Sequence, residues 1–187
     1  MEEKLKEGEL LKKTIQLEGG TKVMVRPIQP SDAEIEWNFV HKLSDQSKYL
    51  RFMSAVHDLT PSMLRYFTDI DLEKHMALIA VIEKNGKEAG IAVGRYFKYP
   101  DRSSCEFALV VADEWQGKGI GYQILSELIA NARNRGIKLM EGEIFSLNKE
   151  MLTLVHDLGF KTSIESGDAS LVRATLNLDS EEGVLWS

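Results

Sequence analysis

Three glycines lie within five residues in the stretch WQGKGIG, residues Trp115 to Gly121, and this spacing restricts how the chain can fold around it. Glycine occurs where the backbone turns sharply or where another group must approach it closely. The spacing differs from the G-x-G-x-x-G fingerprint of dinucleotide-binding folds, and the Lys-Ser or Lys-Thr ending of a P-loop is absent. Two interpretations stay open: a bare strand-to-helix connection, or an anion site made by the free amides at the start of a helix.

The segments on both sides of this stretch predict a strand, a loop and a helix. Before it, Ser104 to Ala112 is an apolar run with the character of a strand. After it, apolar residues recur at helical spacing from Gly119 to Arg135, and Gly136 is placed to end the helix. The glycines therefore lie where the first turn of that helix begins.

The rest of the chain predicts one mixed α/β (α+β) domain in which strands dominate the middle. Asn85-Gly86 is a strong hairpin dipeptide between two apolar segments, and together with the strand from Ser104 these segments predict an antiparallel meander. The other expected strands cover residues 14–18, 21–26, 137–144, 160–164 and 169–178, and the other expected helices cover 35–43, 47–53, 60–69 and 148–158. We expect residues 1–13 to form an arm, 14–178 the domain and 179–187 a tail.

Composition and charge argue against several classes of protein. The net charge is -6, from 23 Lys and Arg against 29 Asp and Glu, whereas a nucleic-acid-binding protein shows a basic surface. No apolar run approaches the length of a membrane span. The charged start MEEKLKEGELLKK is no secretory signal, Cys105 has no second cysteine to pair with, and no zinc-type ligand spacing occurs. We therefore expect a cytoplasmic protein with no metal, no nucleic-acid partner and no membrane partner.

Two short motifs resemble those of the GNAT superfamily of acyl-CoA-dependent N-acyltransferases. The run Gln116-x-x-Gly119-x-Gly121 is similar to the Q/R-x-x-G-x-G/A signature, and Asn148 with Gly-Phe at 159–160 is similar to the N…GF signature. The resemblance implies the GNAT fold, with a mixed, mostly antiparallel central sheet of six to seven strands flanked by about four helices. It also implies a V-shaped splay between the fourth and fifth strands.

A narrower resemblance is to the acetyltransferase domain of bacterial Pat-type protein lysine acetyltransferases. The strings LSDQSKYLRFM, DIDLEKHMALIAV, EFALVVADEWQGKGIG and NKEMLTLVHDLGF carry it. It implies acetyl-CoA as co-substrate and a protein lysine ε-amine as the amine acceptor. Two alternatives stay open, namely a small-molecule amine acceptor and a non-catalytic acyl-CoA-binding sensor. Both a monomer and a homodimer are compatible with the sequence.

The resemblance also implies which residues bind acetyl-CoA. The glycine-rich loop is expected to bind the pyrophosphate, and the strand before it to bind the pantetheine arm through backbone groups, one of which polarises the thioester. Asn148 is expected to contact the cofactor from the neighbouring strand end, a role compatible with that of a helix N-cap. The predicted cofactor-binding residues are Leu109, Val110, Val111, Gln116, Gly117, Lys118, Gly119, Ile120, Gly121, Tyr122 and Asn148.

Glu106 is the predicted general base. A lysine amine with a pKa of about 10.4 is only about 0.04% neutral at pH 7, so a group that removes its proton is useful. Glu106 interrupts the apolar run CEFALVV, where an acid is costly unless it is paired or functional. It also matches the position that the Pat-type resemblance implicates as the base. From the pattern alone, the alternative is a glutamate that reaches solvent or pairs with Arg95 or Arg102.

Two neighbouring positions bear on the expected mechanism. Cys105 and Glu106 must point to opposite faces of their strand, so at most one of them faces a cleft, and we expect direct transfer rather than a route through the thiol. Many GNAT enzymes carry a tyrosine seven residues after the helix asparagine to protonate the leaving thiolate, but here that position is Val155. His156 points about 100° away around the helix. A CoA thiol with a pKa of about 8.5 leaves without much help.

A few polar residues are expected to wall the acceptor side. Arg51, in KYLRFM, either contacts substrate or braces a loop, and Tyr49 lies in the same segment. His57 and His75 are expected to be surface or structural residues.

Overall fold

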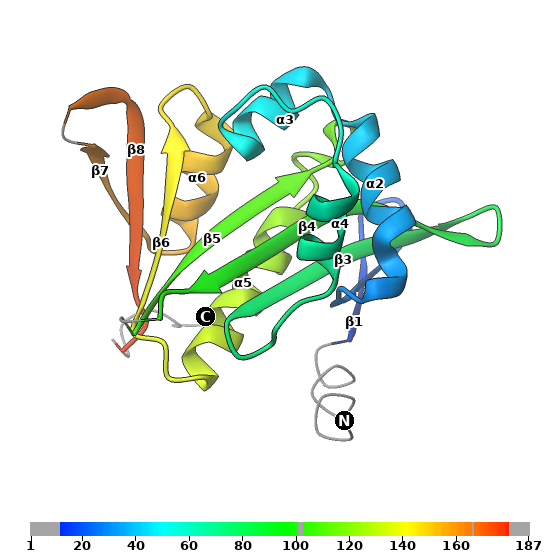
Figure 1. Cartoon of the computed structure of the whole chain (residues 1–187), viewed down its shortest axis with the longest axis horizontal. Helices are drawn as coiled ribbons and strands as arrows, with labels where there is room; N and C mark the ends of the chain where they lie inside the picture. Colours follow the sequence, from blue (N-terminus) through cyan, green and yellow to red (C-terminus); the bar gives the residue numbers. More distant parts are fainter. Residues whose placement is uncertain (1–11, 101–102, 166, 180–187) are drawn as a thin grey trace.

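One sheet organises the part of the chain that the structure describes (Figure 1). The computed structural model describes residues 12–100, 103–165 and 167–179. Its strands are β1 (Lys13–Gln16), β2 (Lys22–Pro27), β3 (His75–Lys84), β4 (Lys87–Lys98), β5 (Ser104–Val111), β6 (Leu139–Phe145), β7 (Lys161–Glu165) and β8 (Asp168–Asn177). Its helices are α2 (Ala33–Lys42), α3 (Asp45–Phe52), α4 (Pro61–Thr68), α5 (Ile120–Asn134) and α6 (Lys149–Asp157), with short 3-10 helices η1 (Pro30–Asp32) and η2 (Asp113–Trp115). The strand order is β1-β2-β3-β4-β5-β6-β8-β7.

The expected mixed architecture with a mostly antiparallel sheet is confirmed, since β5 and β6 are the one parallel pair among the described strands. The described residues hold the eight strands and five α-helices expected segment by segment, rather than the six to seven strands and about four helices that the family resemblance implies. The short strand β1 adds to the edge of the sheet because Gly19 and Gly20, with φ values of 88° and 86°, turn the chain back onto β2. The splay expected between the fourth and fifth strands therefore falls between the fifth and sixth.

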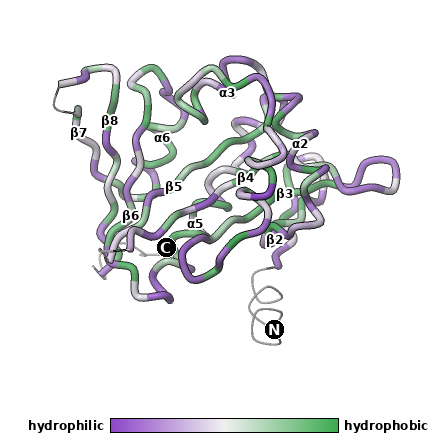
Figure 2. The backbone as a smooth tube through the Cα atoms, in the orientation of Figure 1, coloured by the Kyte–Doolittle hydropathy of each residue, from purple (hydrophilic) through white to green (hydrophobic). Residues whose placement is uncertain are grey.

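The centre of the sheet is the antiparallel meander β3–β4–β5 that the sequence predicted. Asn85 and Gly86 have positive φ values of 54° and 75°, and the register pairs Lys84 with Lys87 across this two-residue turn. Such a turn needs two residues that tolerate positive φ, which asparagine and glycine do. Figure 2 shows the hydrophilic tip of this hairpin extending from hydrophobic strand centres.

Helices cover both faces of the sheet (Figure 1). On one face, Ile124 and Leu128 of α5 pack into a core that includes Leu109 of β5. On the other face, Phe39 of α2 belongs to a second core that includes Val110 of β5. Successive strand residues point to opposite faces, so β5 contributes to both cores. This alternation also places Cys105 and Glu106 on opposite faces of β5.

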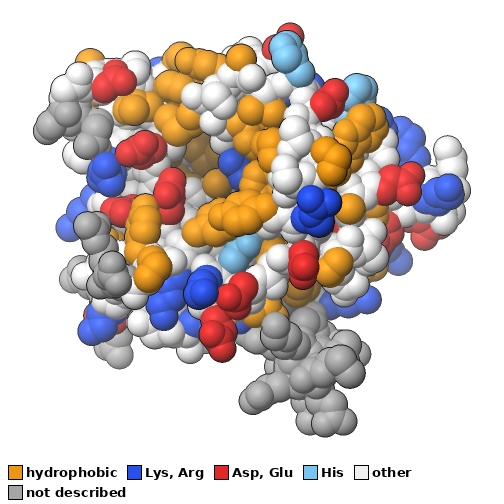
Figure 3. Space-filling view, in the orientation of Figure 1, with side chains coloured by type: hydrophobic (Ala, Val, Ile, Leu, Met, Phe, Trp, Pro, Cys, Tyr) orange, Lys and Arg blue, Asp and Glu red, His pale blue; other side chains and the backbone are white. Residues whose placement is uncertain are grey.

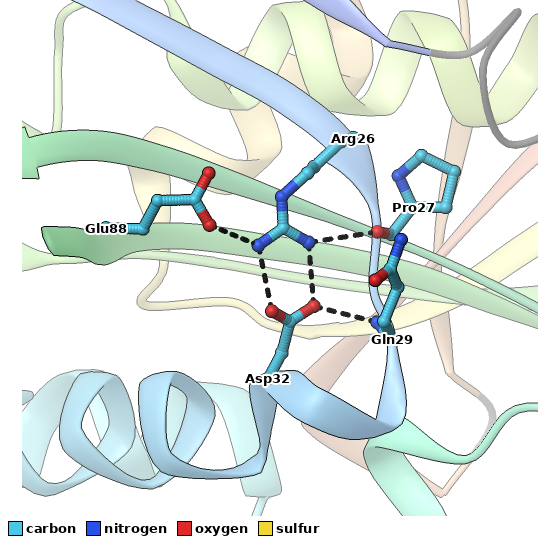
Figure 4. A network of polar contacts seen from close by, with 5 residues as sticks. All are labelled: Arg26, Pro27, Gln29, Asp32 and Glu88. Atoms are coloured by element: carbon cyan, nitrogen blue, oxygen red, sulfur yellow. Dashed lines mark hydrogen bonds and ion pairs between the residues drawn. The ribbon is translucent and has the colours of Figure 1, made fainter.

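A largely buried ionic network fixes α2 against the sheet (Figure 4). The Arg26 guanidinium donates to the two oxygens of Asp32 at 2.7 and 2.8 Å and to Glu88 Oε2 at 2.6 Å. Asp32 Oδ2 also accepts the backbone N–H of Gln29 at 2.8 Å. Bidentate pairs of this kind impose geometry as well as energy, so they hold the start of α2 in place beside β2 and β4.

Strands β5 and β6 part after a short contact. Their pairing runs only from Ser104 with Leu139 to Glu106 with Glu141. Beyond these residues the two strands diverge, β5 toward α3 and β6 toward the start of α6 (Figure 1). The edge of β5 that faces β6 therefore presents backbone groups that no described strand pairs on that side, and buried backbone groups normally find partners.

The predicted arm and tail lie outside the described residues, except for Lys12, Lys13 and Asp179. Strand β1 begins at Lys13, one residue before the expected start of the domain. None of the helices within the described ranges has the length and apolar character needed to cross a bilayer.

Candidate active site

A cavity of about 250 Å³ lies where β5 and β6 part. Its lining comes from the end of α3 (residues 50–53), from β5 (106–109), from β6 (143–144) and from the start of α6 (148 and 151). Figure 3 shows the surface hollowed in this region, with hydrophobic side chains around the hollow and a basic side chain visible inside it. The cavity is thus mainly apolar, with three charged residues in its lining: Arg51, Glu106 and Glu143.

The structure places Glu106 in the lining of this cavity, in contact with solvent. The Tyr99 hydroxyl donates a hydrogen bond to Glu106 Oε2 at 3.0 Å. Burial, and then this hydrogen bond, raise the pKa of Tyr99 to about 12, so its phenol remains a donor at neutral pH. Arg95, one alternative partner of Glu106, instead pairs with Glu36, and Arg102, the other, lies outside the described residues.

Cys105 lies on the opposite face of β5 and is fully buried, at 0% exposure, in the core beneath α5. The expected alternation of Cys105 and Glu106 is therefore confirmed. Burial, and to a smaller extent the charge of Glu141, raise the pKa of the Cys105 thiol to about 12. The thiol stays protonated at neutral pH and lies outside the cavity lining, which favours direct transfer.

The structure gives different reasons for glycine at the three positions of the loop. Gly117 and Gly119 adopt positive φ values of 70° and 78°, and Gly119 is the N-cap of α5. A Cβ at either position would meet nothing within 4 Å, so the backbone there is open to an approaching group. Gly121 lies inside the helix, where a Cβ would be 3.3 Å from Leu154 Cδ2 and 3.4 Å from Leu109 Cδ2. This third glycine lets α5 pack closely against α6 and β5.

The first turn of α5 presents free amides. The N–H of Gln123 bonds to the Gly119 carbonyl at 3.1 Å, so the amides of residues 120–122 precede the first helical hydrogen bond. Free amides and the positive end of the helix dipole favour an anion at this end. Lys118 and Tyr122 are exposed beside them. Binding of pyrophosphate at residues 117–122 stays a prediction that this geometry permits.

The side chain of Gln116 forms hydrogen bonds within the protein. Its side-chain N–H₂ donates to the Val111 carbonyl at 3.0 Å and to Ser47 Oγ at 3.3 Å. These bonds tie the loop to the end of β5 and to α3. In this structure Gln116 therefore shapes the loop, and a direct contact with the cofactor stays a prediction.

Asn148 lies at the start of α6 and lines the cavity together with Leu109. Its Oδ1 accepts the backbone N–H of Met151 at 3.1 Å, which confirms the expected N-cap role. Val110 turns its side chain to the far core, so its contribution to a cofactor site is through the backbone. The cavity thus brings together Glu106, Leu109 and Asn148, whereas the glycine loop lies outside its lining.

No proton donor occupies the position at which many GNAT enzymes carry a tyrosine. Val155 is fully buried in the core beside α5, and the neighbouring His156 is exposed, with Nδ1 3.7 Å from Asp157 Oδ1. The arrangement agrees with a leaving thiolate that departs without a side-chain acid at this helix.

A buried charged cluster, not predicted from the sequence, is connected to the cavity through Arg51. Arg95 and Glu36, 1% and 3% exposed, form an ion pair at 3.0 Å, and Arg95 also donates to the Phe67 carbonyl at 3.1 Å. A signal was present in the sequence: Arg95 interrupts the apolar run AVGRYF, and a buried charge is costly unless it is paired. No group of three or more His, Cys, Asp or Glu side chains in the described ranges is placed to hold a metal ion.

His75 is buried beside this cluster rather than at the surface. It is 5% exposed, its ring stacks on Phe97 with centroids 4.0 Å apart, and its Nε2 has no hydrogen-bond partner. Burial, and then the charges of Arg95 and Arg51, lower the pKa of His75 to about 3, while Asp71 acts in the opposite direction. His75 is therefore neutral at pH 7.

We expect His75 to make the fold sensitive to acid. Its folded pKa of about 3 lies below the value of about 6.5 in an unfolded chain. Between these two pH values the unfolded chain binds more protons at this histidine than the folded protein does. The contribution of His75 to the free energy of unfolding is therefore complete above about pH 6.5 and is lost as the pH falls toward 3. Between pH 6 and 4, His75 should contribute a loss of about 1.4 kcal/mol per pH unit to the free energy of unfolding.

Urea unfolding of wild type and His75→Phe at several pH values measures this contribution. The variant should show a shallower loss of stability on acidification than wild type. His156→Phe, at an exposed histidine, is the matched control and should follow wild type. Parallel curves for wild type and His75→Phe would contradict the burial of a neutral His75.

Comparisons with known proteins agree with this architecture. The family model described as acetyltransferase (GNAT) family matches residues 37–160, which include every element that lines the cavity. Acetyltransferase PA5475 of Pseudomonas aeruginosa is 30% identical over 156 residues, covering 83% of this chain and 84% of that protein. L-amino acid N-acyltransferase MnaT of Escherichia coli is 37% identical over 84 residues, covering 44% of this chain and 49% of that protein. The solved GNAT domain of S. lividans PAT has a TM-score of 0.79 and 29% identity, covering 90% of this chain and 97% of that domain.

Proposed function

Because the chain belongs to the acetyltransferase (GNAT) family, we propose that it transfers an acetyl group directly to a protein lysine ε-amine, with Glu106 as general base. Acetyl-CoA is the acyl donor of this family. The likeness to the GNAT domain of S. lividans PAT supports the narrower assignment to Pat-type enzymes.

The observation that carries the proposal is the position of Glu106 at the point where β5 and β6 part. Glu106 is the last residue of β5 that pairs with β6, it reaches solvent in the cavity, and Tyr99 donates a hydrogen bond to one of its oxygens at 3.0 Å. A carboxylate so placed can accept a proton from an amine in the cavity, directly or through one water. The hydrogen bond to Tyr99 restricts the carboxylate to fewer orientations, which favours a defined geometry for proton transfer.

Each step of the transfer can be assigned to groups of this chain. Backbone groups of β5 beyond Glu106 bind the pantetheine amides, and one N–H donates to the thioester oxygen, where negative charge develops. Glu106 accepts the proton of the acceptor ammonium. The neutral amine nitrogen bonds to the acetyl carbon and then loses its second proton to solvent. The carbon–sulfur bond breaks, and CoA leaves as the thiolate, which takes up a proton from solvent. The amides of residues 120–122 bind the pyrophosphate and so fix the position of the donor.

The proposal is tested by release of free thiol from acetyl-CoA with a lysine-containing protein as acceptor, and mass spectrometry then identifies the acetylated amine. Acetylated lysine side chains are the expected product. If the protein binds acetyl-CoA tightly yet transfers to no amine, it is a sensor of acyl-CoA rather than an enzyme.

A small-molecule amine is the second candidate acceptor. The cavity of about 250 Å³ could enclose a small amine, and one relative is named as an L-amino acid N-acyltransferase. The ratio of kcat/KM for free L-amino acids to that for a lysine peptide decides between the two acceptors. A ratio well above one favours the small molecule.

A further inference from the structure

Arg51 contributes an unpaired cation to the lining of the cavity. It lies in the last turn of α3 and lines the same cavity as Glu106. Its guanidinium carbon lies 5.0 Å from the centroid of the Phe52 ring. The described residues give this guanidinium neither a hydrogen bond nor an ion pair, whereas Arg95 has both.

The surrounding charges leave Arg51 as the excess cation of the cluster. Glu36 is already engaged by Arg95 at 3.0 Å, and His75 is neutral at pH 7. Arg95 repels Arg51, while Glu36 and Glu106 attract it. Since Glu36 is shared between two arginines and Glu106 reaches into solvent, neither acid cancels the charge of Arg51.

Arg51 is half-buried, so its guanidinium keeps only part of its contact with water and has no protein partner among the described residues. Withdrawal of a charge from water costs free energy unless a partner compensates for it. Burial, and then the charge of Arg95, lower the pKa of Arg51 to about 10, which still leaves it positive at pH 7. A planar guanidinium with several free donors is suited to bind a carboxylate through two parallel hydrogen bonds. An anionic group that enters the cavity would supply the missing partner.

We propose that Arg51 binds a carboxylate of the acceptor, so that the preferred acceptors are amines that carry an acidic group close to the reacting nitrogen. This inference rests on the proposed acetyl transfer to an amine at Glu106. The phosphates of acetyl-CoA are assigned to the start of α5, outside the cavity lining, so the anion at Arg51 belongs to the acceptor.

The lining charges suit such a molecule at both of its ends. Glu106 attracts the ammonium that is to be deprotonated, and Arg51 attracts the carboxylate. The apolar part of the lining, which includes Phe107 and Met151, accommodates the carbon chain that joins the two groups. The same carboxylate chemistry can come from a free amino acid or from an acidic residue beside a lysine in a peptide.

Two pairs of acceptors distinguish these sources. The first pair tests a free amino acid: L-leucine carries a carboxylate that 3-methylbutylamine lacks. The second pair tests a peptide: acetyl-Asp-Lys-amide carries a side-chain carboxylate beside the lysine, and acetyl-Asn-Lys-amide carries an uncharged amide there. For each acceptor, kcat/KM is measured with wild type, Arg51→Met and Arg51→Lys. The ratio of wild type to variant is compared within each pair, so differences in the pKa of the two amines cancel.

Arg51→Met should lower kcat/KM for the acidic member of at least one pair by about tenfold or more, and for its uncharged counterpart by about threefold or less. The pair that responds identifies the source of the carboxylate. Arg51→Lys keeps the positive charge, so its kcat/KM for the acidic member should lie between those of Arg51→Met and wild type. If Arg51→Met fails to fold, Arg51→Lys is the variant compared with wild type. Arg65→Met on the exposed side of α4 is the matched control and should change neither member. Equal losses for both members of both pairs, or no loss at all, would overturn the proposal.

A binding measurement separates this inference from the proposed function. Both members of each pair are titrated calorimetrically into protein that holds CoA, where no transfer occurs. Binding by wild type that Arg51→Met weakens about tenfold supports the carboxylate site even if no amine is acetylated. Equal binding of the acidic and uncharged members by wild type overturns the carboxylate site while leaving acetyl transfer intact.

Discussion

Replacement of Glu106 by glutamine is expected to lower kcat by about 100- to 10,000-fold, the range that a positioned general base contributes. Glutamine keeps the size of the side chain and can still accept the hydrogen bond from Tyr99, but it cannot take up a proton at neutral pH. Because the backbone of β5 and the start of α5 are proposed to hold acetyl-CoA, its affinity should change by about threefold or less. Steady-state thiol release and calorimetric titration of CoA measure the two quantities.

Glu143→Gln provides the matched comparison. Glu143 is the other carboxylate in the lining of the cavity, and it is held by Arg173 at 3.2 Å rather than by Tyr99. Its replacement removes the same charge from the same cavity, yet kcat should fall by about threefold or less. If Glu106→Gln retains the wild-type kcat, Glu106 is not the base. If only Glu143→Gln shows a large loss of kcat, Glu143 rather than Glu106 is the general base.

The second large effect is expected for Gly119→Val, which should weaken CoA binding by about 100-fold. A β-branched residue strongly disfavours a φ of 78°, so the variant shifts the N-cap of α5 and the amides that follow it. The new side chain would also occupy space that is open at present, where the pyrophosphate is proposed to approach. Loss of about two charge-assisted hydrogen bonds accounts for a change of this size. Calorimetric titration with CoA measures it.

Gly86→Val separates loss of the site from backbone strain. Gly86 has a φ of 75°, an added Cβ there also meets nothing within 4 Å, and it lies at the tip of the β3–β4 hairpin. Both variants should lose about 1–2 kcal/mol in the free energy of unfolding. Only Gly119→Val should lose affinity for CoA. If Gly119→Val binds CoA with the wild-type affinity, the proposal that this loop binds the pyrophosphate is wrong.

Most elements of the fold were predicted because their signals are local. The helix expected from Gly119 to Arg135 is α5, Ile120–Asn134, since its apolar spacing and its flanking glycines all lie within the segment itself. The Asn85-Gly86 turn and the strands on either side of it were found for the same reason. Strand alternation predicted that Cys105 and Glu106 point to opposite faces of β5, while the placement of Glu106 at a cleft came from the family resemblance.

The partners of the site residues were not predicted, because they are distant in sequence. Glu36 and Arg95 are 59 residues apart, and their pairing depends on how α2 lies across β4. Gln116 was expected at the cofactor, and the hydrogen bond from its amide to Ser47, 69 residues away, was not predicted. His75 was expected at the surface or in a structural role, and only the packing of β3 against Phe97 and the two arginines makes it a buried neutral base.

By itself, the sequence determined that the chain forms a strand, a glycine loop and a helix that suit an acyl-CoA, because these depend on residues adjacent in the chain. The tertiary structure decided where β5 and β6 part, that β8 rather than β7 lies beside β6, and that Arg51 faces Glu106's cavity without a partner. Gly121 shows the division within one motif: the motif predicted a glycine for a ligand, and the packed structure adds a second reason, since a Cβ there would lie 3.3 Å from Leu154 Cδ2. These features depend on contacts between segments that are far apart in the chain, so they cannot be predicted from the pattern of residues within one segment.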